Sequence, residues 1–201
     1  MTELERDVSA DTDNPDRTPM GVLLALASLG AAQALWAAFQ WYELGEMRRG
    51  GETLCDLVGG GCGVAWNSPA ATAIHEATGL PVAAWGVVWG VAAAAAALFR
   101  LKSERNELNG AIRLLAAAGV LACLALTVLL LQNGAICMTC LVTYGLVLGY
   151  AAIAFWVPLG GVDWALGAAI AAGFCAVVFG LALLAGRDTP TETAQSGSVE
   201  V

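Results

Sequence analysis

Two cysteines stand three residues apart in the segment ICMTCLVTYG, residues 136–145, which opens a long apolar run. The spacing of Cys137 and Cys140 is typical of redox-active dithiols and of metal-binding pairs. Because both follow Asn133-Gly134, we expect them in the first turns of a helix, where partial positive charge and unpaired N–H groups stabilise a thiolate. A thiolate attacks disulfides and electrophilic carbons. The alternative is that both cysteines are buried as small apolar side chains.

A second pair, Cys55 and Cys62, stands in the segment LCDLVGGGCGVAWNSP. The glycines at 59–61 give the backbone before Cys62 a freedom that suits a thiol with more than one partner. The remaining cysteines, Cys123 and Cys175, fall within apolar runs. We interpret these two as apolar packing residues.

The composition is that of a membrane protein: 58% of the residues are hydrophobic, 13% are charged and the mean hydropathy is +0.70. Five runs are long enough to cross a hydrocarbon core of about 30 Å, which takes about 20 helical residues. They are Met20–Tyr42, Leu80–Phe99, Ala111–Leu131, Ala135–Val157 and Trp164–Ala185. The sequence therefore predicts an all-α membrane protein with five transmembrane helices, the first of them a signal anchor rather than a cleaved signal peptide.

The predicted organisation is one membrane redox domain over residues 20–186, with disordered tails at 1–19 and 187–201. The net charge of −8 comes largely from these tails and indicates no nucleic-acid partner. Basic residues cluster after the second span, whereas the loop 43–79 holds only Arg48 and Arg49. The positive-inside rule then puts the N-terminus in the cytoplasm and the loop 43–79 outside. Both cysteine pairs are expected on the outer face, where disulfides form and persist.

Two further patterns lead to expectations about packing and interfaces. Gly86-x3-Gly90 and Gly145-x3-Gly149 predict close helix packing in the second and fourth spans. His75, the only histidine, is expected as a solvated residue on a short interfacial helix, although it could also deliver protons. Trp85 is expected in an aromatic belt at the membrane interface, with a cavity wall formed by Trp85 and Trp89 as the alternative.

The motifs together resemble the vitamin K epoxide reductase family in its bacterial, disulfide-forming branch. The resemblance covers about residues 20–157 and is carried by Cys55, by Cys62 with a serine six residues later, by GLPVAAWG at the start of the second span, and by CMTC-x3-Y. It implies a four-helix bundle around a quinone, ubiquinone or menaquinone. A loop pair, Cys55 and Cys62, would pass electrons to the pair Cys137 and Cys140.

By the same resemblance, Ser68 and Tyr144 are expected to bind loop or quinone oxygens, and Asn67 to stand beside them at the start of the short interfacial helix. Many bacterial members carry a thioredoxin-like domain after the fifth span. Because this chain ends soon after that span, we expect its partner to be a separate periplasmic thioredoxin-like (DsbA-type) protein. The implied function is a quinone-dependent thiol–disulfide oxidoreductase of the bacterial inner membrane.

Three alternatives remain. The four outer cysteines could bind copper or zinc, in a metal-binding or transport protein. Against a metal site, the chain has no second Cys-x-x-Cys and no histidine near the cysteines, and no charged residue in mid-membrane marks an ion path. The cysteines could also serve only as structural disulfides, or belong to an unrelated four-helix thiol oxidase linked to quinone.

Overall fold

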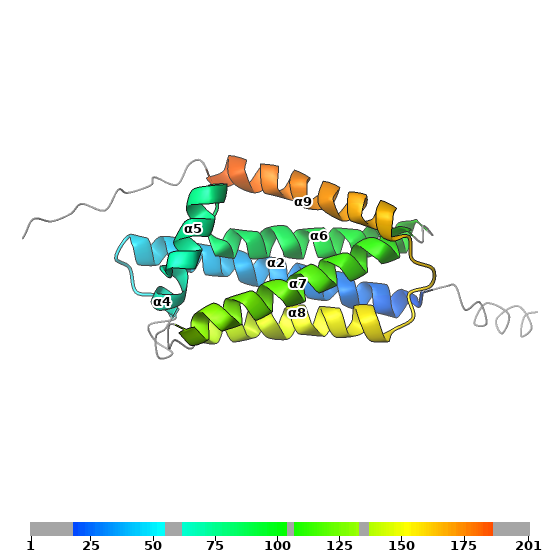
Figure 1. Ribbon diagram of the computed structural model, residues 1–201, viewed down its shortest axis with the longest axis horizontal. Coiled ribbons are helices and arrows are strands. Elements are labelled where there is room, and N and C mark those ends of the chain that lie inside the picture. The colour runs from blue at the N-terminus through cyan, green and yellow to red at the C-terminus, as the bar shows by residue number, and fades with distance from the viewer. Residues whose placement is uncertain (1–17, 55–61, 104–106, 133–136, 187–201) are drawn as a thin grey trace, which may run out of the picture.

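The computed structural model describes residues 18–54, 62–103, 107–132 and 137–186, and within them it contains helices and no strand. Five helices are long and apolar enough to cross a membrane. They are α2 (Met20–Arg48), α6 (Val82–Lys102), α7 (Glu107–Gln132), α8 (Met138–Trp156) and α9 (Trp164–Gly186). The five predicted spans are therefore confirmed, although α2 continues well past Tyr42. Two short helices, α4 (Cys62–Trp66) and α5 (Pro69–Thr78), lie across one end of these spans (Figure 1).

Four of the long helices form a closed bundle. Helix α2 packs on α6, α6 on α7, α7 on α8, and α8 back on α2. Helix α9 packs outside this ring, against α6 and α7, and runs alongside them in Figure 1. This arrangement confirms the all-α membrane fold with four of the five spans in one bundle. The predicted domain limits and tails at 1–19 and 187–201 stay predictions, because most of the tail residues lie outside the described ranges.

The contact between α2 and α6 brings two backbones together. A Cβ atom added to Gly90 would lie 2.5 Å from the backbone nitrogen of Ala34, and one added to Gly30 would lie 2.6 Å from that of Ala94. At Gly86 the added atom would lie 2.9 Å from the Cβ of Ala37. Only glycine permits such close approach, which confirms the packing predicted for Gly86 and Gly90.

The same pattern in α8 does not have this role. A Cβ atom at Gly145 would meet nothing within 4 Å, and one at Gly149 would meet only the methyl groups of Leu29, the nearer at 3.9 Å. The prediction of close packing at these two glycines is wrong. The pattern shows that small residues share a helix face, but the face carrying Gly145 has no helix against it.

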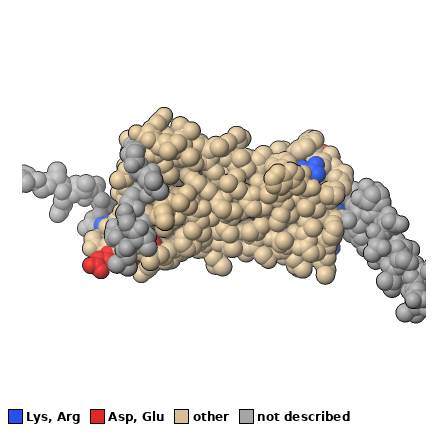
Figure 2. All heavy atoms as spheres, turned by 90° about the horizontal axis from the view of Figure 1, so that it is seen from below, with Lys and Arg blue, Asp and Glu red and all other residues tan. Residues whose placement is uncertain are grey.

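Charged side chains gather at the two ends of the molecule. In Figure 2 the long flank between the ends is free of Lys, Arg, Asp and Glu on the face that is seen. At the end opposite α4 and α5, Arg100 donates through Nε to Asn109 Oδ1 at 2.9 Å. Asn109 Nδ2 in turn donates to the carbonyls of Leu159 and Gly161, and Leu159 also accepts a hydrogen bond from the Thr18 hydroxyl. These bonds tie α6, α7 and the connection between α8 and α9 to one another.

Candidate active site

Three of the predicted cysteines meet at the end of the bundle that carries α4. Cys62 is the first residue of α4, and its Sγ lies 3.6 Å from Sγ of Cys137. The two side chains are 0% and 2% exposed. Cys137 and Cys140 form a disulfide with their Cα atoms 5.2 Å apart. Cys62 is disulfide-bonded as well, and Cys55, its predicted partner, lies outside the described residues.

The inner pair stands at a helix start, as predicted. Cys137 is the N-cap of α8, and its sulfur accepts a hydrogen bond from the backbone nitrogen of Cys140 at 3.3 Å. This N–H, which also donates to the carbonyl of Cys137 at 3.1 Å, lies in the first turn of the helix and favours negative charge on the sulfur. The local geometry therefore suits a thiolate whenever the disulfide is reduced.

Thr139 stands between the two cysteine sulfurs that approach each other. Its hydroxyl oxygen lies 3.2 Å from Sγ of Cys137 and 3.3 Å from Sγ of Cys62, and the residue is 4% exposed. Its carbonyl accepts a hydrogen bond from Trp36 Nε1 in α2 at 3.0 Å. The sequence analysis missed this residue, because nothing in a Cys-x-x-Cys pattern specifies where the intervening side chains point.

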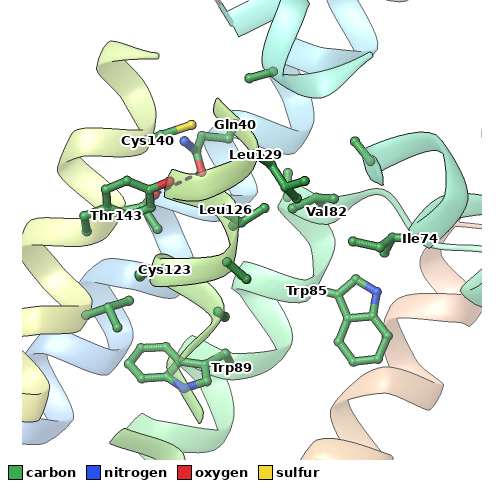
Figure 3. Close-up of a pocket in the computed structure, with 18 of the residues that line it drawn as sticks. Gln40, Ile74, Val82, Trp85, Trp89, Cys123, Leu126, Leu129, Cys140 and Thr143 are labelled. Carbon is green, nitrogen blue, oxygen red and sulfur yellow. Dashed lines mark hydrogen bonds between the residues drawn. The ribbon is translucent and has the colours of Figure 1, made fainter. Parts of the chain in front are cut away.

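A cavity of about 540 Å³ lies inside the bundle next to these sulfurs. All four bundle helices line it, together with α4 and α5, and Cys140 is part of its wall. Trp85 and Trp89 line it from α6, so they form a cavity wall as in the alternative considered for them; that the cavity holds a quinone stays a prediction. Their indole N–H groups are bonded to Thr78 Oγ1 and to the carbonyl of Leu115. The two rings therefore offer apolar surface to the cavity (Figure 3).

A few polar groups interrupt this apolar wall. Gln40 Oε1 accepts a hydrogen bond from the Thr143 hydroxyl at 3.3 Å, next to Cys140 in Figure 3. Gln33 lines the cavity two helical turns away, is 1% exposed, and its Oε1 has no hydrogen-bond partner among the described residues. The Tyr144 hydroxyl is also buried without a hydrogen bond of ordinary geometry to any described residue. Such atoms are costly to leave unpaired, so they identify where a polar ligand atom would be bound.

A family model independently covers this part of the chain. The model of the vitamin K epoxide reductase family matches residues 21–157, from the start of α2 to the end of α8. The chain belongs to the vitamin K epoxide reductase family. No curated protein and no solved structure matches it. As a member of this family the chain is a membrane oxidoreductase, and the family uses quinones; its assignment to the bacterial branch stays a prediction.

The remaining residues predicted from the family motifs occupy different surroundings. Ser68 lines the large cavity, but its hydroxyl accepts from the backbone nitrogen of Ala71 and caps α5. The predicted short helix is confirmed as α5, with Pro69 in its first turn and Gly79 as a left-handed cap at φ 74°; its position at the membrane interface stays a prediction. Asn67 lines a neighbouring cavity of about 50 Å³ instead of the large one. Tyr144 stands in the wall of the large cavity.

Of three residues outside the motifs, two differ in part from expectation. Cys123 is a free thiol that lines the large cavity, so apolar packing describes only part of its surroundings. Cys175, also free, packs against the apolar cores as predicted. His75 is half-buried instead of solvated, lines the small cavity beside Asn67, and has its Nδ1 buried without a hydrogen-bond partner in the described part of the chain.

The two glutamines of α2 were missed, although the sequence carried a signal for them. Gln33 and Gln40 are seven residues apart, which places them on one face of a helix, and polar side chains within a transmembrane segment are costly and mark function.

For the metal alternative, the described residues contain no group of three or more His, Cys, Asp or Glu that could hold an ion. This reductase-family fold therefore lends no support to a metal site in those ranges.

Proposed function

We propose that the chain is a quinone-dependent thiol–disulfide oxidoreductase. It passes electrons from a periplasmic thioredoxin-like dithiol protein through two cysteine pairs to a membrane quinone, and so supports disulfide formation. The observation that carries the proposal is the 3.6 Å separation between Sγ of Cys62 and Sγ of Cys137, with Cys140 in the wall of the large cavity. A disulfide exchange between the two pairs needs this contact. Electron delivery to a quinone bound in the cavity needs a cysteine in the cavity wall.

The relay consists of balanced thiol–disulfide exchanges. A thiolate of the donor protein attacks Cys55 of the Cys55–Cys62 disulfide, and the donor leaves oxidised. The Cys62 thiolate then attacks Sγ of Cys137, so that a Cys62–Cys137 disulfide forms and Cys140 leaves as a thiolate. The Cys55 thiolate next attacks Cys62, which releases Cys137 and restores the loop disulfide. Two electrons have then moved from the donor to Cys137 and Cys140.

The large cavity fits a quinone. Its wall is mostly apolar, which suits a ring and an isoprenoid chain. The Tyr144 hydroxyl would donate to one quinone oxygen, and Gln33 would donate to the other through Nε2. The unpaired Oε1 of Gln33 is an acceptor, so it would pair with a hydroxyl of the quinol. When bound, the quinone supplies a two-electron, two-proton oxidant that is stronger than a protein disulfide.

The chain's own residues prepare this electron transfer. Cys140 presents its sulfur at the cavity wall, and the Cys137 thiolate closes on it as the pair gives up two electrons and reforms its disulfide. Trp85 and Trp89 offer apolar ring surface to the cavity. Hydroxyl donors in an apolar site stabilise charge that develops on an oxygen, which is the role proposed for Tyr144.

The test is quinone reduction by the purified chain in detergent, followed by quinone absorbance, with either a reduced thioredoxin-like protein or dithiothreitol as donor. Cys55→Ala is expected to abolish turnover with the protein donor and to spare turnover with dithiothreitol, which reaches Cys137 and Cys140 directly. Cys175→Ala, which removes a thiol outside the site, serves as the control. Equal loss of both activities in Cys55→Ala contradicts the relay order, and no quinone reduction by the unaltered chain contradicts the function.

The proposed membrane orientation has a separate test. A membrane-impermeant maleimide added to intact cells after mild reduction is expected to label Cys55 or Cys62. A tag placed after residue 201 should be accessible from outside, and one at Lys102 should not. Labelling of Lys102 from outside inverts the orientation and puts both pairs in the reducing cytoplasm.

A further inference from the structure

The Thr139 hydroxyl is placed against both sulfurs that the relay must join. It lies 3.2 Å from Sγ of Cys137 and 3.3 Å from Sγ of Cys62, while the two sulfurs are 3.6 Å apart. The three atoms thus form a compact triangle in which each is in contact with the other two. A hydroxyl has one proton, so Thr139 can donate to one sulfur at a time.

The two sulfurs of this triangle are buried, since Cys62 is 0% and Cys137 is 2% exposed. Their hydrophobic neighbours are Ala65, Trp66, Leu130 and Cys140. Burial without a partner disfavours a charged sulfur. The backbone N–H of Cys140 is shared between Sγ of Cys137 at 3.3 Å and the carbonyl of Cys137 at 3.1 Å. The Thr139 hydroxyl is within hydrogen-bond distance of Sγ of Cys62.

The position of the hydroxyl is fixed from two directions. The Thr139 carbonyl is bonded to Trp36 Nε1 of α2, and a β-branched side chain in a helix has few χ1 rotamers. Thr143, one turn later on the same helix, donates its hydroxyl to Gln40 instead. The two threonines therefore have separate partners, and only Thr139 contacts the sulfurs.

We propose that the Thr139 hydroxyl is a catalytic hydrogen-bond donor for the exchange between the two cysteine pairs, an inference that rests on the proposed relay. It donates first to the Cys62 thiolate and holds it against Sγ of Cys137. The Cys62–Cys137 bond forms, the Cys137–Cys140 bond breaks, and the electron pair leaves on Cys140. When Cys55 then displaces Cys137 from this bond, the same hydroxyl turns to the departing Cys137 thiolate.

Removal of the hydroxyl has opposite effects at low and high pH. A hydrogen bond to a charged group changes an equilibrium about tenfold or more, so Thr139→Val lowers the thiolate fraction of Cys62 by about that factor wherever the thiol predominates. Each remaining thiolate is more nucleophilic by about threefold. Thr139→Val should therefore exchange about threefold or more slowly at neutral pH, and as fast as or faster than the unaltered chain at high pH, where Cys62 is fully ionised.

The experiment follows a single exchange in the full chain carrying Cys55→Ala, which stops the relay after its first internal step. The fully reduced protein is mixed with excess soluble short-chain quinone, quenched with acid at successive times, alkylated and digested. Mass spectrometry then measures the Cys137–Cys140 disulfide, which should form first, and the Cys62–Cys137 disulfide, which should replace it. The rate of replacement is compared for Thr139, Thr139→Val and Thr139→Ser from about pH 6 to about pH 10.

Thr139→Ser keeps the hydroxyl and should keep the pH profile of the unaltered residue. Thr72→Val is the control, because Thr72 is exposed on α5 and does not line the large cavity. An unchanged exchange rate and pH profile in Thr139→Val overturns the proposal. Equal slowing of Thr139→Val and Thr139→Ser at every pH also overturns it, since the common cause would be altered side-chain packing and not the hydroxyl. If Cys137–Cys140 forms but Cys62–Cys137 never does, the relay itself fails; if neither forms, quinone dependence fails.

Discussion

The two ends of the bundle differ in how far their buried polar groups are hydrogen-bonded. At the end that carries Arg100, Asn109 uses both its amide oxygen and its amide nitrogen in hydrogen bonds to three other residues. At the cavity end, Gln33 Oε1 and His75 Nδ1 are buried without partners in the described residues, and Tyr144 Oη has only a poorly aligned contact with the Thr127 hydroxyl. Glu107 Oε2 is the one such atom among the described residues at the other end. A satisfied amide holds helices together, and an unsatisfied one beside a cavity indicates a place for a ligand.

The largest effect should come from the inner cysteine pair. Cys137→Ala or Cys140→Ala is expected to abolish quinone reduction with every thiol donor, since each removes a sulfur of the disulfide that faces the cavity. Stability should change little beyond the loss of that local disulfide, because a loop of this length restricts the unfolded chain only slightly. Steady-state turnover and reversible unfolding in detergent measure the two properties. Residual quinone reduction above the uncatalysed rate would contradict the assignment of the site.

At the end that carries Arg100, a substitution should lower stability and leave turnover unchanged. Asn109→Leu keeps the shape of the side chain but leaves the Leu159 and Gly161 carbonyls and the Arg100 guanidinium without that partner. We expect the free energy of unfolding to fall by about 2–4 kcal/mol, with turnover per folded molecule retained. Gln132→Ala, at the exposed end of the same helix, is the control. Loss of turnover at full stability would remove the distinction between the two ends.

The smallest effect is expected for Gln33→Leu, and the sign of its change in the free energy of unfolding is informative. Gln33→Leu should raise the KM for quinone about tenfold, because one bound oxygen loses its partner, while the free energy of unfolding stays equal or rises by up to ~1 kcal/mol. Gln40→Leu is the matched comparison on the same face of α2. Since Gln40 accepts from Thr143, its replacement should lower the free energy of unfolding by about 1 kcal/mol. If both variants are destabilised equally, Gln33 is a structural residue. The proposal that it binds a ligand oxygen in the cavity is then wrong.

Sequence patterns predicted what depends on neighbours along the chain. The helix start at Cys137 followed from Asn133-Gly134, because turns are local. The family motifs led to the start of α5 next to Asn67. The motifs also led to Cys62 and Tyr144, which the structure brings to the site. The roles of these residues in a relay stay predictions until tested.

What the sequence could not supply depends on which elements meet. Gly90 and Gly145 belong to identical patterns, yet only Gly90 faces another backbone. Thr139 gains its contact with Cys62 from a residue 77 positions away in the chain. Gln33 was missed for a different reason. Its polarity within a span was visible in the sequence, but the cavity beside it is formed by four helices together, which no single segment indicates.

The gap between Cys62 and Cys137 also sets the scale of motion in the relay. Their sulfurs are 3.6 Å apart, and a disulfide bond is about 2.05 Å long, so the exchange moves a sulfur by about 1.5 Å. A small rotation about χ1 covers that distance without displacing α8 or α4. Side-chain rotation is fast compared with the docking of a protein or the exchange of a lipid-soluble molecule. Throughput should therefore depend on how quickly reduced protein arrives and quinol leaves, and thus on their supply in the membrane and its surroundings.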